Sequence, residues 1–180
     1  SIAVVHNGII ENFEGLREEL SAQGYVFTSD TDTETIAHLV EALLKDEPDL
    51  FHAVQRACRR LVGAYGIAVI DQRQPGKVVV AREGSPLLLG LGADGNYAAS
   101  DASALLQVTR NMVYLENGDI AELTVSGVRI ERLDGTPVER PVHVSQLSAA
   151  AVELGNFRHY MQKEIFEQPE ALANTLEIVG

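Results

Sequence analysis

The sequence predicts an α+β fold in which helices come first, mostly antiparallel strands follow, and a helix closes the chain. Three observations support this fold class. Apolar residues recur at helical spacing from Phe13 to Leu61, and the pattern changes to extended segments after Gly63. Residues 159–178 then return to a helical pattern. Because helices and strands do not alternate along the chain, a layered sandwich is favoured over a fold built from βαβ units.

The first element is a short apolar segment, residues 2–6, which we expect to form a buried strand. It ends at Asn7-Gly8, where we expect a backbone turn. A helix should begin after Asn12, a residue type that caps helices, and end at Gly24. Residues 25–28 are expected to form a short strand.

Two further helices have clear start signals. Thr31 and Glu34 match the T-x-x-E capping box that precedes many helices. Asp49 directly follows the helix-breaking Pro48 and is expected to cap the next helix. The apolar positions expected to be buried on these two helices are Ile36, Leu39, Val40, Leu43 and Leu44, and Leu50, Val54, Ala57, Cys58 and Leu61.

The extended half of the chain contains at least six expected strands, separated by turns that carry glycine or proline. The first of them are residues 64–71, 77–82, 87–91 and 97–100. A short helix should begin at Ser100 or Asp101. The next strands should form a meander joined by Asn-Gly and Ser-Gly turns, and they are residues 112–115, 119–125 and 128–133.

The last part of the chain has a different character. Residues 136–156 are polar and alanine-rich without a clear period, so we expect them to be linker-like. Residues 159–178 should form a helix bent at Pro169. We therefore divide the chain into a layered domain, residues 1–140, and a linker with a helix, residues 141–180.

Charge and cysteine content limit the classes of partner. The chain has 14 basic and 26 acidic residues, a net charge of -12, which would repel nucleic-acid phosphates and anionic lipids. We therefore expect neither nucleic acid nor a membrane as a partner. A membrane is disfavoured also because the longest apolar run, residues 61–70, is far shorter than the roughly 20 residues of a membrane helix. The single cysteine, Cys58, fits a cytoplasmic protein.

The Asn7-Gly8 pair also has a chemical interpretation. Gly8 can adopt positive φ and expose its backbone N–H, and Asn7 carries a side-chain amide donor beside it. Two donors that converge in this way could hold an oxyanion. From these residues alone, a simple hairpin turn remains the alternative, because Asn-Gly is the strongest short hairpin signal.

Several motifs occur together in a characteristic order. They are H-N-G-I-I-E-N at residues 6–12, S-D-T-D-T-E at 29–34, G-A-Y-G at 63–66, G-S-P-L at 84–87, A-S-D at 99–101, E-N-G-D-I at 116–120 and F-R-H-Y-M-Q-K-E-I-F-E-Q-P at 157–169. This ordered set resembles the glutaminase domain of N-terminal-nucleophile, or class II, glutamine amidotransferases. The last motif is most similar to members in which sugar-isomerase domains follow and ammonia passes to fructose 6-phosphate. The resemblance implies the four-layer αββα sandwich of that family.

The resemblance also implies roles for three residues. The side-chain amide of Asn7 and the backbone N–H of Gly8 would form the oxyanion hole for glutamine hydrolysis. Gly8 and Asp32 would bind glutamine, with the Asp32 carboxylate paired with the α-ammonium group. No cofactor is implied. Without the resemblance, Asp32 is explained by its place in the first turn of a helix, where a carboxylate favours the helix dipole.

The chain departs from the family pattern at Ser1. In the family, the nucleophile is an N-terminal cysteine whose own α-amine acts as the general base. We therefore expect residues 1–140 to be the remaining two-thirds of a glutaminase domain that is inactive by itself, and residues 141–180 to lead to absent sugar-isomerase domains. The complete protein would be a homo-oligomer. The alternative nucleophile within the chain is Ser1 itself, since serine serves this role in other enzymes.

Other reactive residues have simpler explanations. Cys58 lies between apolar helix positions and should be a small buried residue. The five histidines lack metal-ligand spacing, and His6 should be structural rather than a general base. Residues 90–95 match G-x-G-x-x-G, but a strand should follow, so a hairpin is favoured over a dinucleotide site. For the whole chain, the alternatives are a class II amidotransferase that uses phosphoribosylpyrophosphate and a non-catalytic binding module.

Overall fold

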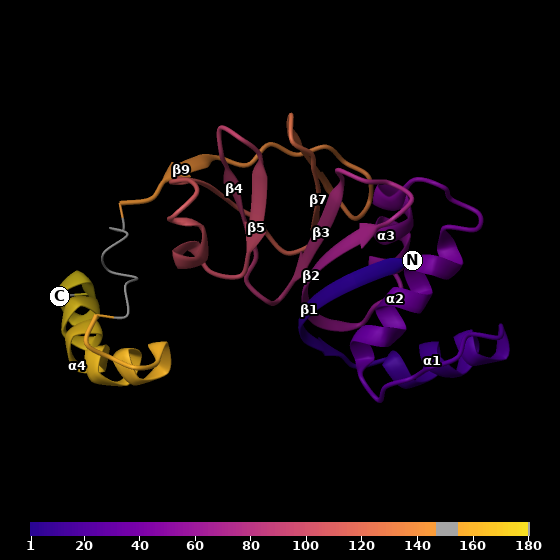
Figure 1. Cartoon of the computed structure of the whole chain (residues 1–180), viewed down its shortest axis with the longest axis horizontal. Helices are drawn as coiled ribbons and strands as arrows, with labels where there is room; N and C mark the ends of the chain where they lie inside the picture. The colour runs from indigo at the N-terminus through magenta and orange to yellow at the C-terminus, as the bar shows by residue number, and fades with distance from the viewer. Residues whose placement is uncertain (147–154, 180) are drawn as a thin grey trace. The chain divides into compact units, whose positions relative to one another are not determined.

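The computed structural model describes residues 1–146 and 155–179. The chain forms two compact units, residues 1–146 and residues 147–180. The first unit contains two antiparallel sheets and the helices of the N-terminal half, and the second contains one long helix (Figure 1). The assignment of residues 1–140 to a glutaminase domain and of residues 141–180 to a linker and helix stays a prediction.

In the described part of the first unit, the larger sheet has the strand order β1-β2-β3-β7-β8, with every neighbouring pair antiparallel. Its strands are β1 (Ile2–Ile10), β2 (Gly63–Asp71), β3 (Val78–Glu83), β7 (Asp119–Leu123) and β8 (Val128–Arg132). Side chains on a strand point alternately to its two faces. Thus Ile67 and Val69 of β2 belong to the core under the helices, whereas Ala68 contacts the core between the sheets.

The smaller sheet has the order β5-β4-β6-β9 and lies on the face of the larger sheet opposite the helices (Figure 1). Its strands are β4 (Leu88–Leu91), β5 (Asn96–Ala99), β6 (Asn111–Tyr114) and β9 (Val142–Val144). A short 3-10 helix, η1 (Ala102–Leu105), follows β5, and the Asp101 carboxylate accepts a hydrogen bond from Ser103 N at 2.7 Å. The short helix predicted at this point is therefore confirmed.

Three helices lie on the outer side of the larger sheet: the second and third pack against the sheet, and the first packs against the second (Figure 1). They are α1 (Phe13–Ala22), α2 (Asp32–Leu43) and α3 (Leu50–Cys58). Their apolar faces meet the sheet in one core that includes Leu39, Val40, Phe51, Val54, Ile67, Val69, Val79 and Ile120. The order helix, sheet, sheet matches three successive layers of the αββα sandwich that the sequence resemblance implied.

The helix starts agree with the sequence in two of three cases. The Thr31 hydroxyl accepts a hydrogen bond from Glu34 N at 3.4 Å, and the Asp49 carboxylate accepts one from Phe51 N at 2.8 Å. Asn12 precedes α1 but makes no side-chain cap. Its side-chain NH₂ group instead donates to Arg60 O, and its side-chain oxygen accepts from Val62 N, because the residues that follow α3 lie beside it.

Residues 25–28 do not form the predicted short strand. Tyr25 and Phe27 pack against the helical core, and the backbone N–H of Thr28 donates to the Glu34 carboxylate at 2.8 Å. The segment is therefore held by side chains of α2 and its surroundings instead of by a partner strand. A run of four aromatic and β-branched residues cannot distinguish these two cases.

The predicted meander is wrong in its first strand. β6 pairs with β4 and β9 in the smaller sheet, whereas β7 and β8 belong to the larger sheet. The connection with Asn117-Gly118 crosses between the sheets: Leu115 N still donates to Leu87 O, and Gly118 N already donates to Arg82 O. An Asn-Gly signal indicates a change of direction, but distant strands decide which sheet the chain joins next.

The predicted linker also contains regular structure. β9 lies within residues 136–156 and pairs with β6 through Met112 and His143. Residues 147–154 of the same segment lie outside the described residues. In the second unit, α4 (Tyr160–Val179) confirms the predicted terminal helix, and Pro169 lies inside it. The rings of Phe157 and Phe166 stack with centroids 5.6 Å apart.

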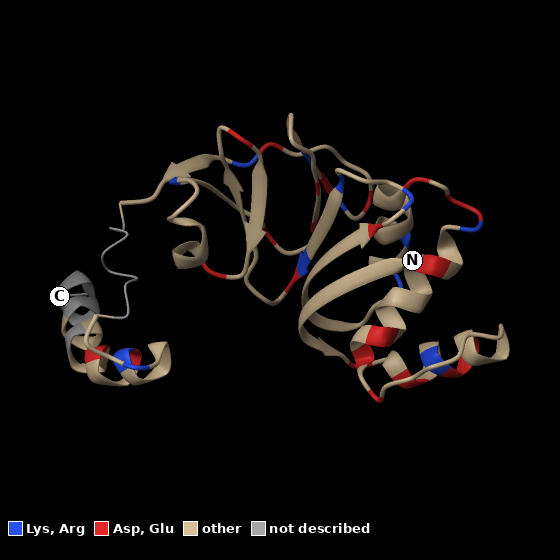
Figure 2. Cartoon of the chain, in the orientation of Figure 1, with Lys and Arg blue, Asp and Glu red and all other residues tan. Residues whose placement is uncertain are grey.

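Acidic side chains are frequent on the helices of the first unit. Figure 2 shows Asp and Glu along α1, α2 and the segment that follows α2.

Among the helices that the structure describes, none has the length and apolar character to cross a membrane.

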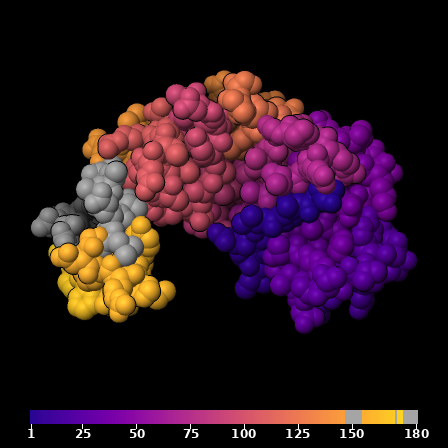
Figure 3. Space-filling view, in the orientation of Figure 1, coloured from indigo at the N-terminus to yellow at the C-terminus, as the bar shows by residue number. Residues whose placement is uncertain are grey.

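β1 is a continuous edge strand and not the first arm of a tight hairpin. Its pairing with β2 runs without interruption from Ile2 opposite Asp71 to Ile10 opposite Gly63, so the turn predicted at Asn7-Gly8 does not occur. Figure 3 shows β1 at the surface of the first unit. Gly8 sits inside the strand with φ of 134°, and a Cβ there would lie 2.0 Å from the carbonyl oxygen of Ala64. The special conformation predicted for Gly8 is present, but it serves strand pairing.

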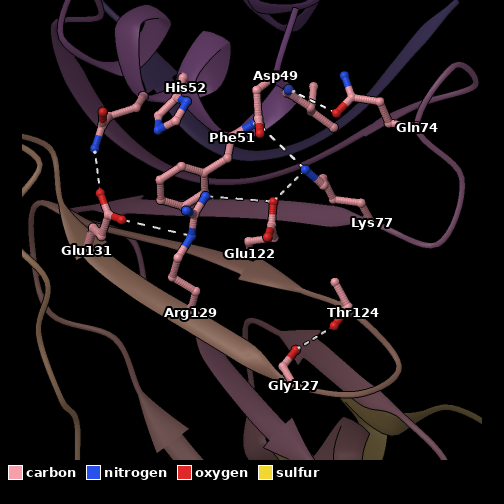
Figure 4. Close-up of polar contacts among 12 residues, drawn as sticks. Asp49, Phe51, His52, Gln74, Lys77, Glu122, Thr124, Gly127, Arg129 and Glu131 are labelled. Atoms are coloured by element: carbon pink, nitrogen blue, oxygen red, sulfur yellow. Dashed lines mark hydrogen bonds and ion pairs between the residues drawn. The ribbon is translucent and has the colours of Figure 1, made fainter.

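Polar contacts fasten α3 to the far strands of the larger sheet. The Lys77 ammonium group lies 3.4 Å from the Asp49 carboxylate and 2.7 Å from that of Glu122 (Figure 4). The Arg129 guanidinium lies 3.9 Å from the centroid of the Phe51 ring. The N-terminal turn of α3 is therefore tied to β3, β7 and β8 by charge as well as by apolar packing.

A buried ion pair joins the start of β7 to the segment before β9. The Asp119 carboxylate is fully buried, and the Arg140 guanidinium binds it through two hydrogen bonds of 2.8 Å. Arg140 also lies 2.8 Å from Glu116. This pair attaches the segment before β9 to the start of β7 and compensates the charge of a carboxylate that has no access to water.

We predict that Arg140→Met lowers the free energy of unfolding by roughly 3–5 kcal/mol, because it leaves the Asp119 carboxylate buried and unpaired. Urea unfolding followed by circular dichroism measures the loss. The same change at the exposed Arg110 should alter stability by less than about 0.5 kcal/mol. An equal loss of unfolding free energy in the two variants would show that the buried pair contributes no more to stability than an exposed arginine does.

We predict that Gly8→Ala destabilises the chain by roughly 2–5 kcal/mol, because it adds a backbone clash to an unfavourable φ. The control is Gly15→Ala on α1, where a Cβ meets no heavy atom within 4 Å. This second change should stabilise by about 0.5–1 kcal/mol, through the better helix propensity of alanine. A neutral Gly8→Ala variant in urea unfolding would refute the close approach of β1 and β2.

Candidate active site

A pocket of about 240 Å³ lies beside Asn7, between the edge of the larger sheet and one end of the smaller sheet. Asn7 and Val5 line it from β1, and Gly66 lines it from β2. Pro86 and Ser100, from the segments that flank β4 and β5, close its other side. Asn7 thus lines a cavity large enough for part of a small molecule, whereas the neighbouring Gly8 is not among the residues that line it.

Asp32 lies at the other side of β1. It is the first residue of α2, and its carboxylate accepts a hydrogen bond from Ile10 N at 2.9 Å. The side chain keeps 22% of its surface exposed. The structure therefore brings Asp32 to the end of β1, two residues from Gly8, while Asn7 faces the pocket.

His6 connects β1 to the first turn of α2. Its Nδ1 lies 3.1 Å from the Thr33 hydroxyl and 3.7 Å from the Asp32 carboxylate. The side chain is 2% exposed, and burial lowers the pKa of the imidazole despite the opposing charge of Asp32. A neutral, packed imidazole agrees with the expected structural role and sets the distance between the strand and the helix.

The other candidates are far from this site or chemically unsuited. Cys58 is buried in the helical core, and desolvation raises the pKa of its thiol to about 12, so it is not a thiolate at neutral pH. Ser1 precedes β1, and six extended residues place it roughly 20 Å from Asn7. Residues 90–95 form the hairpin between β4 and β5, as predicted. Within the described residues, no group of His, Cys, Asp or Glu side chains is placed to hold a metal ion.

The residues that shape the pocket opposite Asn7 carry no functional signal in the local sequence. Ser100 and Pro86 belong to motifs that were recognised, but no local signal showed that they would face β1. Their positions could have indicated the pocket. Each lies at the end of an expected strand, and that strand has to pack on the strand expected at residues 64–71. Glu34 matches half of a capping box in the sequence, yet its carboxylate binds Thr28 and Ser29 instead of the Thr31 backbone.

The lowered pKa of His6 gives a pH prediction. In the unfolded chain His6 takes up a proton as the pH falls through about 6.5, whereas in the folded chain it resists protonation. The contribution of His6 to the free energy of unfolding is therefore fully present above that pH and is lost as the pH falls below it. Urea unfolding between pH 7.5 and 5 should therefore show a steeper decline for the unaltered chain than for His6→Asn. His143→Asn, at an exposed histidine of β9, controls for loss of an imidazole as such. Parallel curves for all three proteins would contradict the prediction.

Comparison with known proteins identifies the family. Residues 1–107 match the glutamine amidotransferase domain. The glutamine–fructose-6-phosphate aminotransferases of Acidithiobacillus ferridurans and Vibrio cholerae are 60% and 55% identical over 98% of this chain, which spans 29% of their length.

The structure of the glutamine phosphoribosylpyrophosphate amidotransferase from B. subtilis matches with a TM-score of 0.64 at 27% identity, over 73% of this chain and 29% of that one. These matches confirm both the family resemblance found in the motifs and the predicted α+β fold class. The match to the family model includes Asn7, Gly8 and Asp32. The chain therefore belongs to the glutamine amidotransferase domain family.

Proposed function

We propose that this chain carries the glutamine-binding half of a glutaminase site, with Asn7 and Gly8 as the oxyanion hole. The observation that supports this most is that Asn7 lines a pocket of about 240 Å³ while the Asp32 carboxylate binds the end of the same strand. Attack on the glutamine side-chain carbonyl moves an electron pair onto its oxygen. The Asn7 amide and the Gly8 N–H would donate hydrogen bonds to that oxygen.

The remaining steps need a nucleophile, and we place it outside the residues that the structure describes. Cys58 is buried as a thiol, and Ser1 lies at the far end of β1. The nucleophile would form an acyl bond to the side-chain carbon as ammonia leaves with an added proton, and water would then release glutamate. Asp32 would bind the α-ammonium group of glutamine through charge, and Gly8 would provide space for the substrate beside the strand.

For the complete protein, we propose transfer of the released ammonia to fructose 6-phosphate, which gives glucosamine 6-phosphate. The names of relatives that are 60% and 55% identical support this acceptor. The acceptor would bind to sugar-isomerase domains that lie outside this chain, and the complete enzyme would be a cytoplasmic homo-oligomer. A reducing cytoplasm suits a single cysteine that is buried and protonated.

The test is glutamate and ammonia release from glutamine by the complete reading frame and by the 180-residue chain, with glucosamine 6-phosphate formation measured in parallel. Only the complete protein should release ammonia, and it should form the amino sugar when fructose 6-phosphate is added. Ammonia release by the 180-residue chain would overturn the placement of the nucleophile. A complete protein that is folded and does not hydrolyse glutamine would overturn the proposed function.

We predict that Asn7→Ala in the complete protein lowers kcat for glutamine hydrolysis by about 10²–10³, because one oxyanion donor is lost. The KM for glutamine should change little, since the donor acts on charge that develops in the transition state. Asn111→Ala, at an exposed position of β6, should leave both constants unchanged. A rise in KM at constant kcat would instead assign Asn7 to substrate binding.

A further inference from the structure

The Glu34 carboxylate is the centre of a hydrogen-bond network that the capping-box interpretation did not anticipate. One oxygen accepts from Thr28 N at 2.8 Å and from the Thr28 hydroxyl at 2.9 Å. The other accepts from Ser29 N at 2.7 Å and from the Ser29 hydroxyl at 2.6 Å. A carboxylate in the first turn of α2 thus binds two consecutive residues of the segment that precedes the helix.

The network continues to the residue before Asp32. The Ser29 hydroxyl donates to Glu34, so its oxygen is available to accept from the Thr31 hydroxyl at 2.9 Å and from Thr31 N at 3.3 Å. The Thr31 oxygen in turn accepts from Glu34 N at 3.4 Å. This closed ring of contacts fixes residues 28–31, and with them the direction in which the chain enters α2 at Asp32.

The position of Asp32 depends on two anchors. On one side its carboxylate binds Ile10 N of β1 at 2.9 Å. On the other side its backbone continues the turn that Glu34 holds. The four donors keep Glu34 ionised and lower its pKa to about 2, while His38 Nε2 lies 3.6 Å from the same carboxylate. A glutamine at position 34 could not reproduce this pattern, because its NH₂ group would face N–H donors.

We propose that Glu34 is a positioning residue for glutamine binding, which holds the turn of residues 28–31 so that the Asp32 carboxylate is oriented toward the α-ammonium group of the substrate. This inference rests on the proposed function of Asp32. Glu34 does not touch the substrate, so its loss should weaken ground-state and transition-state binding alike. Such a change raises KM with little effect on kcat.

The first experiment compares Glu34→Gln with Glu41→Gln in the complete protein. Both remove one charge from α2 without changing side-chain size. The Glu41 side chain is 43% exposed, and its carboxylate lies 4.0 Å from His38 Nδ1. Glu34→Gln should raise the KM for glutamine about tenfold with kcat within about twofold, whereas Glu41→Gln should change neither. Equal effects of the two variants, or a fall in kcat without a rise in KM, would overturn the proposal.

The second experiment places Glu34→Gln in an Asp32→Asn background. If Glu34 acts through Asp32, the double variant should have the same KM as Asp32→Asn alone. If the increase in KM of the double variant equalled the product of the increases in the two single variants, Glu34 would act independently of Asp32, and the inference would be overturned. If Asp32→Asn by itself leaves KM unchanged, both the binding role of Asp32 in the proposed function and the role of Glu34 through it are wrong.

Ser29→Ala provides a milder variant if Glu34→Gln does not fold, as judged by circular dichroism. It removes the shortest hydroxyl contact to Glu34 and the acceptor for Thr31, and it keeps the Ser29 N–H bond. We expect a KM rise of about threefold to fivefold at constant kcat. An unchanged KM in a folded Ser29→Ala protein would overturn the proposal where Glu34→Gln cannot be measured.

Discussion

The close pairing of β1 with β2 is the constraint on which the candidate site depends. A Cβ on Gly8 would lie 2.0 Å from the carbonyl oxygen of Ala64, and one on Gly63 would lie 2.2 Å from that of Ile9. These glycines have φ of 134° and 128° and flank the Ile9–Ala64 pair from opposite strands. Both strands are thus distorted at one place without loss of register, which glycine tolerates better than any other residue.

Alternation along β1 then divides the site between two layers of the fold. His6 points to the helices and meets Thr33 and Asp32, whereas Asn7 points to the smaller sheet and lines the pocket. The same edge strand therefore presents a polar donor to the cavity and an imidazole to the helix. A shift of one residue in the register would exchange these faces. The paired glycines and the uninterrupted ladder make such a shift costly.

The first turn of α2 carries two carboxylates that bind chain segments outside the helix. Asp32 accepts from Ile10 N, and Glu34 accepts from Thr28 and Ser29. Both are placed where the helix dipole favours negative charge. Burial lowers the pKa of His6 beside them, so the two carboxylates are balanced by hydrogen-bond donors and by the positive end of the helix dipole instead of by an imidazolium. The packing of α2 on β1 and the electrostatics of the proposed substrate site therefore have the same origin.

Local sequence signals were sufficient to predict the three N-terminal helices, the caps at Thr31 and Asp49, and the hairpin at residues 90–95. Through a resemblance to a family, the sequence also predicted a shared site for Asn7, Gly8 and Asp32, and this stays a prediction. It predicted a turn at Asn7-Gly8, a strand at residues 25–28 and a meander through β6, and these were wrong. In each case a distant partner decided: Ala64 and Tyr65 for Gly8, Glu34 for Thr28, and Leu87 for Leu115. Only the tertiary structure brought Ser100 opposite Asn7 and Glu34 around Ser29, because strand pairing and side-chain networks join residues that local propensity treats as independent.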